Sequence, residues 1–218
     1  MARRPIFSPD LTKVGVIEKT FDFKWHSGIS PEQKKKSILD LHKSANHCGL
    51  KNILEISSKS ELRIGIQLSA FNLSFITKKK KVKLSVECAF HASKYFEFGG
   101  PYTDLLFSNS LAAKRDRRLK TSGDLKGFRF FNLNFPLLPR TYFYDWLYIN
   151  TLLQNKKLAE DVLFFENFSD IEFNPQKSIN CQAHALALYI SLYKLGMLKE
   201  ATLSPADFLQ CCYSYYHE

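Results

Sequence analysis

Two segments of the chain carry complete helix-start signals, and these fix where two of its helices must begin. They are SPEQ at 30–33 and SPAD at 204–207. Each places a hydroxyl cap before a proline, with a carboxylate or an amide in the first turn. The apolar stripe of the first helix continues to Gly49 and that of another helix ends at Gly196, because glycine terminates helices readily.

The remaining pattern alternates between helical and extended segments. A helix is predicted over 85–98, where the pair Gly99-Gly100 and then Pro101 stop it. Further helices are predicted over 110–120, 141–165 (one long or two consecutive) and 179–195. Strands are predicted over 21–25, 52–57, 68–76 and 127–131, with a lysine-rich hairpin tip at 78–81.

Length and composition favour one domain. With 218 residues, 45% of them hydrophobic, the chain can bury one sizeable core. It contains no internal repeat, low-complexity segment or linker. We therefore predict one helix-dominated α+β domain over residues 1–218, with a small N-terminal antiparallel sheet.

Charge and cysteine usage indicate the environment and the class of partner. The net charge of +10 attracts polyanions, among which are nucleic acids and phosphorylated ligands. Five cysteines, without a disulfide framework or a C-x-x-C pair, favour a reducing compartment. No apolar signal segment develops near Met1, and the apolar run at 183–192 is too short to span a bilayer. We expect a cytoplasmic protein without a membrane segment.

Several enzyme classes lack their motifs in this sequence. It holds no P-loop, G-x-G-x-x-G, G-x-S-x-G or H-E-x-x-H. These absences leave NTPases, Rossmann dehydrogenases, serine hydrolases of the α/β fold and zinc proteases without support. We expect His42, His47 and Cys48 to be surface and core residues rather than metal ligands, and we expect no metal and no cofactor.

One predicted helix carries three different ionisable groups on one stripe. Glu87, His91 and Lys94 stand at i, i+4 and i+7, which places an acid, an imidazole and an amine along the same side. Such a stripe on a rigid element suits acid–base chemistry. The same spacing is also typical of an exposed, salt-bridged helix face.

The sequence around this stripe resembles the NADAR (YbiA-like) family. The family signature, E-h-y-f-Q-a-x-K-f, is similar to ECAFHASKYF at 87–96, and its earlier F/L-S-N-F segment is similar to LSAFN at 68–72. His91 departs from the pattern, since the family usually has Gln there. The later blocks that agree are Ala113-Lys114-Arg115, Trp146 and a looser helix entry at Asn180.

The likeness extends over the chain, through segments 68–76, 85–105, 110–120, 141–150 and 170–184. It is greatest for the branch of NADAR proteins associated with DarT-type toxins, which shares strings such as GGPYTDL at 99–105, FYDWLY at 143–148 and IEFNP at 171–175. The resemblance implies a hydrolase that removes ADP-ribose from the guanine bases of DNA and so acts as an antitoxin. Two alternatives are an antitoxin that only binds and neutralises the toxin, and an N-glycosidase for a riboflavin-pathway metabolite.

The resemblance also implies a set of site residues. Glu87 is the expected catalytic carboxylate, although a first-turn glutamate also suits a helix start. Lys94 is expected either to pair with the diphosphate or to attack the opened ribose. Other candidates for binding ADP-ribose or the base are Ser69, Asn72, Phe90, His91, Gly99, Gly100, Tyr102, Asp104, Lys114, Asp145, Trp146, Glu172, Asn174 and Asn180.

The expected partners follow from this substrate. ADP-ribosylated DNA is the substrate and ADP-ribose the product, and the cognate toxin is a further candidate partner. Because a base inside a duplex is hard to reach, single strands or flipped nucleotides are favoured. Arg115, Arg117 and Arg118 form a basic cluster that suits a phosphate backbone or, alternatively, a solvated helix face.

Overall fold

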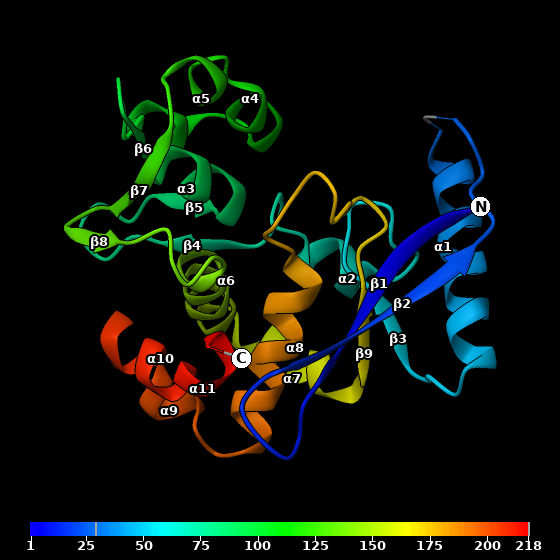
Figure 1. Cartoon of the computed structure of the whole chain (residues 1–218). Coiled ribbons are helices and arrows are strands. Elements are labelled where there is room, and N and C mark those ends of the chain that lie inside the picture. Colours follow the sequence, from blue (N-terminus) through cyan, green and yellow to red (C-terminus); the bar gives the residue numbers. More distant parts are fainter. Residues whose placement is uncertain (29, 218) are drawn as a thin grey trace. The chain divides into compact units, whose positions relative to one another are not determined.

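The computed structural model describes residues 1–28 and 30–217, and Figure 1 labels its helices and strands. Its backbone contacts group into two compact units, Met1–Ser69 with Lys156–Glu218 (unit 1) and Ala70–Asn155 (unit 2). Helices and strands occur in both units, with helix predominating, which confirms the predicted α+β class. The prediction of a single domain over 1–218 stays a prediction.

Unit 1 contains one four-stranded sheet in the order β2-β1-β9-β3. Strand β1 pairs antiparallel with both β2 and β9, and β3 runs parallel to β9. The strands and helices of this unit are β1 (Ala2–Pro9), β2 (Val16–Phe23), α1 (Pro31–His47), β3 (Ile53–Glu55), α2 (Arg63–Leu68), α7 (Lys156–Asp161), η2 (Val162–Phe164), β9 (Asn167–Ser169), α8 (Gln182–Lys194), α9 (Leu198–Ala201), α10 (Pro205–Cys211) and α11 (Tyr213–Tyr216).

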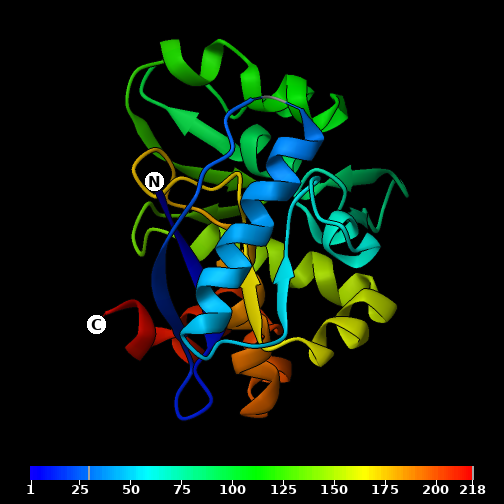
Figure 2. The ribbon, with the colours of Figure 1, turned by 90° about the vertical axis from the view of Figure 1, so that its right-hand side faces the viewer.

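Two helices cover the faces of this sheet. Helix α1 lies on one face and α8 on the other, as the two views of Figures 1 and 2 agree. The buried side chains Ile38, Leu41 and Ala45 of α1 pack against Phe21 and Phe23 of β2, which buries the apolar stripe of the helix. Ser30 caps α1 as predicted, since its hydroxyl accepts a hydrogen bond from the backbone N–H of Gln33.

Unit 2 holds a hairpin, a three-stranded sheet and the short helices between them. Strands β4 and β5 form the hairpin, and β6, β7 and β8 are antiparallel in that order. Its strands and helices are β4 (Ser74–Ile76), β5 (Lys83–Ser85), α3 (Val86–Ser93), β6 (Lys94–Phe96), η1 (Thr103–Phe107), α4 (Ser110–Arg115), α5 (Arg118–Thr121), β7 (Leu125–Phe130), β8 (Leu133–Phe135) and α6 (Tyr142–Gln154).

The core of unit 2 is aromatic. Phe143 of α6 contacts Phe128, Phe130 and Phe135 of the sheet, at ring-centroid distances of 4.8, 6.0 and 4.7 Å. Phe90 of α3 joins them at 5.5 Å from Phe128. Aromatic pairs at such distances stabilise a core beyond the area that they bury. They pack α3 against the sheet, and α3 carries the candidate catalytic residue Glu87.

Three predictions of secondary structure need correction. The helix predicted over 85–98 ends at Ser93, because residues 94–96 pair with β7 instead. The strand predicted over 68–76 is extended only at 74–76, since α2 includes Leu68. The helix predicted over 110–120 is interrupted at Asp116 and forms the two short helices α4 and α5. In each case tertiary pairing or local capping overrides helix or strand propensity.

The other predicted elements are present, although their ends differ by a few residues: the helix predicted over 179–195 begins at Gln182, and the strand predicted over 21–25 ends at Phe23. The segment 141–165 forms two consecutive helices followed by a 3-10 turn. Lys81, at the predicted hairpin tip, has a positive φ of 53°. Within the described ranges, no helix is both long enough and apolar enough to cross a bilayer.

Candidate active site

The first turn of α3 is fixed to the segment that precedes the β4–β5 hairpin. Ser85 caps the helix by accepting a hydrogen bond from the backbone N–H of Cys88 at 3.1 Å. The backbone N–H of Val86 donates to Leu73 O at 2.9 Å, and that of Glu87 donates to Ala70 O at 3.0 Å. These bonds fix the position of the Glu87 backbone.

Lys94 leaves the helix rather than extending it. It is the C-cap of α3 and the first residue of β6, where it pairs with Phe128. Gly100 supports this turn with a φ of +82°, and a Cβ there would lie 2.5 Å from Lys94 O, so only glycine fits. The carbonyl of Gly99 accepts a hydrogen bond from Phe96 N at 2.7 Å. The glycine pair therefore allows the chain to pack closely against the start of β6 at Lys94.

The three predicted ionisable residues lie together, connected through His91. Glu87 Oε1 lies 3.2 Å from His91 Nε2, and His91 Nδ1 lies 3.3 Å from Lys94 Nζ. Glu87 and His91 are buried, at 6% and 8% exposure. Lys114 Nζ reaches Glu87 Oε1 from α4 at 3.4 Å. The arrangement is thus a buried cluster rather than an exposed, salt-bridged helix face.

The carboxyl group of Glu87 stays ionised in spite of its burial. Burial alone would raise its pKa, but the hydrogen bond from His91 and the positive charge of Lys114 outweigh burial and lower the pKa below its ordinary value. A negative charge inside unit 2 is therefore compensated by partners on two helices. It is available to stabilise a positive charge that develops next to it.

His91 is neutral at pH 7, because burial lowers its pKa below the ordinary value. The hydrogen bond and the charge of Glu87 oppose this shift, whereas the charges of Lys94 and Lys114 add to it. A neutral imidazole carries one N–H. With an anionic acceptor at Nε2 and an amine donor at Nδ1, the proton belongs on Nε2. His91 thus donates to Glu87 and accepts from Lys94.

Lys94 has an amine of unusually low basicity. Burial lowers its pKa to about 8 and Lys114 contributes in the same direction, while the charge of Glu87 opposes the shift. The amine lies 4.6 Å over the ring of Phe90, whose other contacts, such as Tyr144 at 5.1 Å, are aromatic. A minor fraction of this amine is therefore neutral near physiological pH, far more than for an ordinary lysine, and the neutral form is the nucleophile.

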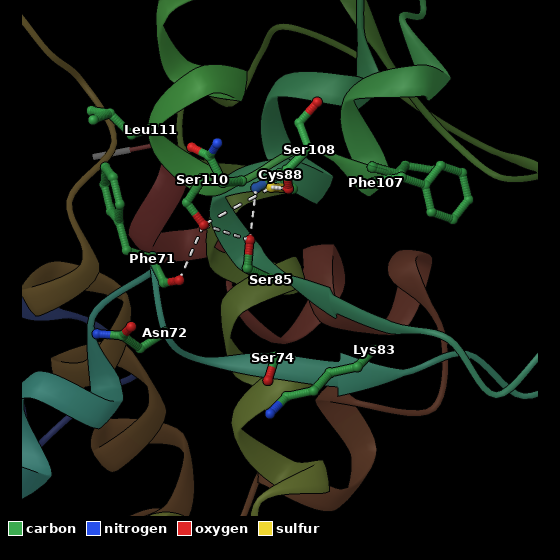
Figure 3. A pocket seen from close by; sticks show the side chains of 12 residues that line it. Phe71, Asn72, Ser74, Lys83, Ser85, Cys88, Phe107, Ser108, Ser110 and Leu111 are labelled. Carbon is green, nitrogen blue, oxygen red and sulfur yellow. Dashed lines mark hydrogen bonds between the residues drawn. The ribbon is translucent and has the colours of Figure 1, made fainter.

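A pocket of about 630 Å³ lies in the same unit (Figure 3). It is lined by Phe71, Asn72, Ser74, Lys83, Ser85, Cys88, Leu106, Phe107, Ser108, Asn109, Ser110 and Leu111. Glu87, His91 and Lys94 are not in this lining. Phe71 connects the two, because Lys114 Nζ lies 5.1 Å over its ring while also pairing with Glu87. The charged cluster is the candidate reactive centre, since the residues that line the pocket include only Lys83 and Cys88 as titratable groups.

Other predicted residues of unit 2 lie in a second cluster around Arg118. This arginine donates to Asp104 Oδ2 at 2.6 Å and to Asp116 Oδ1 at 2.9 Å, and it lies 4.4 Å over the ring of Tyr102. Its guanidinium lowers the pKa of the Asp104 carboxyl. Arg118 is thus engaged with carboxylates, whereas Arg115 and Arg117 are exposed.

The remaining predicted residues of unit 2 have different surroundings. Asp145 is fully buried on α6. Trp146 packs against Phe130 and Phe135, and its indole N–H is buried without a hydrogen-bond partner. Asn72 is exposed and lines the pocket.

Four predicted residues belong to unit 1. Ser69 is buried, and Glu172 pairs with Lys34 at 3.4 Å. Asn174 accepts a hydrogen bond from Gln176 N and lines a pocket of about 480 Å³ in that unit. The side-chain oxygen of Asn180 is buried and has no hydrogen-bond partner. Their roles toward a ligand stay predictions.

Sequence reasoning missed Phe71, Ser85 and Ser110. Phe71 stands inside the LSAFN string, and that position was the available signal for it. Ser85 and Ser110 come together only through the fold, with their hydroxyls 2.9 Å apart. Among residues 1–28 and 30–217, no group of three or more His, Cys, Asp or Glu side chains is arranged to hold a metal ion.

Comparison with known proteins identifies the family of the chain. No curated protein matches the chain. A family model described as "DarT1-associated NADAR antitoxin" matches residues 2–218, which include both units and every residue of the Glu87 cluster. The chain therefore belongs to the family of DarT1-associated NADAR antitoxins.

Proposed function

We propose that this antitoxin is a hydrolase that removes ADP-ribose from guanine bases of DNA. The observation that carries the proposal is the buried chain from the Glu87 carboxylate through neutral His91 to the amine of Lys94. An ionised carboxylate beside a partly neutral amine is costly to bury, and such pairs concentrate at functional sites.

The carboxylate suits the bond that would be broken. Guanine is joined through its amino nitrogen to the anomeric carbon of the ribose, and cleavage makes that carbon electron-poor. A fixed anion near it gains interaction energy as the positive charge develops. Glu87 is held from both ends, by its backbone bond to Ala70 and by its side-chain partners His91 and Lys114, so it needs little reorganisation during the reaction.

The amine suits a covalent route. When the ribose ring oxygen takes up a proton and its bond to the anomeric carbon breaks, that carbon forms an iminium with the guanine nitrogen. The neutral amine of Lys94 adds to this carbon, and one of its protons moves to the guanine nitrogen, which leaves as the free amino group. Water then hydrolyses the resulting lysine Schiff base, and closure of the ribose ring gives ADP-ribose and regenerates the amine.

His91 positions the other two groups. Its Nε2–H orients the carboxylate and its Nδ1 accepts a hydrogen bond from the amine. In our proposal the imidazole keeps its single proton throughout the reaction. Its carboxamide counterpart in other members of the family offers the same donor and acceptor, so the departure at position 91 is compatible with the same chemistry.

Charge supports a nucleic acid as the carrier of the modified base. The chain has a net charge of +10, and Arg115 and Arg117 are exposed on unit 2. A single strand is the favoured substrate, because the linkage must reach a buried carboxylate and a paired base cannot do so without leaving the helix.

The test is product analysis on a guanine-ADP-ribosylated oligonucleotide. We expect stoichiometric ADP-ribose and restored guanine by liquid chromatography and mass spectrometry. Borohydride should reduce the Schiff base and so attach ADP-ribose, without the oligonucleotide, permanently to Lys94. Lys94→Arg should abolish this trapping. Wild-type protein that releases nothing would contradict the proposal. Protection from the toxin without release would then indicate neutralisation by binding, and turnover of a riboflavin-pathway metabolite alone would indicate a metabolite N-glycosidase.

A further inference from the structure

The pocket next to the Glu87 cluster combines three kinds of surface. Figure 3 shows the hydroxyls of Ser85 and Ser110 with Cys88 at its centre, Phe71 and Leu111 to one side and Phe107 to the other. A volume of about 630 Å³ is in the range of small-molecule sites. Hydroxyls, aromatic rings and aliphatic side chains together suit a flat ligand with polar edges.

The centre of the pocket is ordered by its own hydrogen bonds. The hydroxyl of Ser110 donates to Phe71 O at 3.1 Å, so the contact of 2.9 Å between the two serine hydroxyls has Ser85 as donor. The thiol of Cys88 donates to Ser108 O at 3.1 Å. These bonds fix the orientation of the side chains before any ligand arrives, and such preorganisation lowers the entropic cost of binding.

Lys83 is the charged residue in the lining. It is exposed, and within the described part of the chain it has no ion-pair partner, whereas Lys114 is paired with Glu87. An unpaired ammonium at the wall of a pocket attracts an anionic group of the ligand. The ligand should therefore carry a phosphate or a similar anion.

The outer wall exposes apolar surface to solvent. Phe107 is 70% exposed and Leu111 is 46% exposed, although both line the pocket. Exposed aromatic side chains next to an unpaired cation are the elements with which proteins bind single-stranded nucleic acid, because bases stack on the rings while the cation contacts the backbone.

One residue links the pocket to the reactive cluster. Phe71 lies in its lining and under the amine of Lys114, which pairs with Glu87. We infer that this pocket holds the nucleotide next to the modified guanine on the same strand, with its base against the apolar wall and its phosphate at Lys83. The inference rests on the proposed function, because it makes the pocket a second subsite for that substrate.

The test compares two substrates: a guanine-ADP-ribosylated single-stranded oligonucleotide, and ADP-ribosylated guanosine monophosphate, which has no neighbouring nucleotide. Phe107→Ser and Lys83→Met should each lower kcat/KM on the oligonucleotide by about fivefold or more, the range expected for a lost base stack or phosphate contact. Both variants should leave kcat/KM on the mononucleotide unchanged. Lys79→Met, at the hairpin tip and outside the lining, is the matched control and should resemble wild type on both substrates.

Equal losses on the two substrates would overturn the inference, because the pocket would then hold part of the ADP-ribose or would support the Glu87 cluster structurally. Unchanged kcat/KM on the oligonucleotide would overturn it as well. If wild type releases ADP-ribose from neither substrate, the proposed function fails, but binding of a nucleotide in the pocket can still be tested. In that case fluorescence anisotropy with an unmodified oligonucleotide must show weaker binding by the two variants than by Lys79→Met, and equal binding would contradict the inference.

Discussion

Among residues 1–28 and 30–217, each unit buries one glutamate, and the two glutamates have opposite surroundings. Glu87 in unit 2 is 6% exposed and has His91 and Lys114 as partners. Glu55 in unit 1 is 3% exposed, and it accepts hydrogen bonds from Ser169 Oγ at 2.5 Å and from Ile171 N at 2.9 Å. Burial raises the pKa of Glu55 and the hydrogen bonds only partly oppose it, whereas the partners of Glu87 lower its pKa.

The histidines near the two carboxyl groups also differ in their contacts. His42 contacts Ser169 at 2.8 Å and so reaches Glu55 only through a hydroxyl, and burial lowers its pKa to about 4. His91 contacts Glu87 directly through Nε2, and its other ring nitrogen, Nδ1, contacts the amine of Lys94. Burial alone therefore does not make a carboxylate reactive, and the presence of compensating cations decides whether the group is charged and available.

The largest effect should come from removing the charge at position 87. Glu87→Gln should lower the rate of ADP-ribose release on the order of 10³-fold, because an amide cannot stabilise the developing positive charge. The matched variant Glu55→Gln should retain most of the activity. Single-turnover rates measure both, with thermal unfolding as a check on the fold. Similar losses in the two variants would break the comparison.

The next effect concerns stability and belongs to Glu55. Glu55→Ala should lower the free energy of unfolding by about 3 kcal/mol, because it leaves the Ile171 N–H without its acceptor and opens a cavity. Glu55→Gln should cost less than about 1 kcal/mol at pH 7, since the amide resembles a protonated carboxyl group. Urea denaturation measures both values. Equal costs for Ala and Gln would contradict the prediction that the amide replaces a protonated Glu55.

Lys94 should determine the pH dependence. Its pKa is lowered to about 8, so the neutral, nucleophilic fraction increases as pH rises through that value, and kcat should rise with it. Lys94→Met should be about 10²-fold slower and lack this step. Lys120→Met, an exposed lysine of the same unit, should keep the wild-type profile. A kcat that falls as pH rises through 8 would instead favour a purely electrostatic role for the ammonium.

The smallest effect should follow a change at His91. Because His91 is neutral, it presents one donor and one acceptor, and a carboxamide presents the same pair. His91→Gln should keep kcat within about threefold of wild type with an unchanged pH profile, while His91→Leu should lose about tenfold. Steady-state kinetics across the pH range separate the two variants, and equal losses would show that a donor and an acceptor at position 91 are not sufficient.

The sequence was most informative where signals are local. The caps at Ser30 and Ser204, the hairpin tip and the strand at 52–57 all follow the prediction. The end of α3 does not, because Lys94 pairs with Phe128, which lies in a strand more than thirty residues later. Helix propensity cannot anticipate that competition.

In the candidate site too, local patterns were predictable from the sequence and tertiary contacts were not. The sequence brought Glu87, His91 and Lys94 together on an assumed helix, and they do meet, but Lys94 reaches His91 from the start of a strand. The cluster around Glu55 was not anticipated. It assembles His42, Glu55 and Ser169 from three distant segments, and no sequence motif connects these three positions.

The measurement that tests the central contrast most directly is a carbon-13 NMR titration of the side-chain carboxyl groups, with Glu87→Gln and Glu55→Gln used to assign the two signals. The account predicts that Glu87 is still ionised at pH 4.5, the ordinary pKa of a glutamate, and that Glu55 is still protonated there. Glu87 protonated at that pH, or Glu55 ionised, would contradict it.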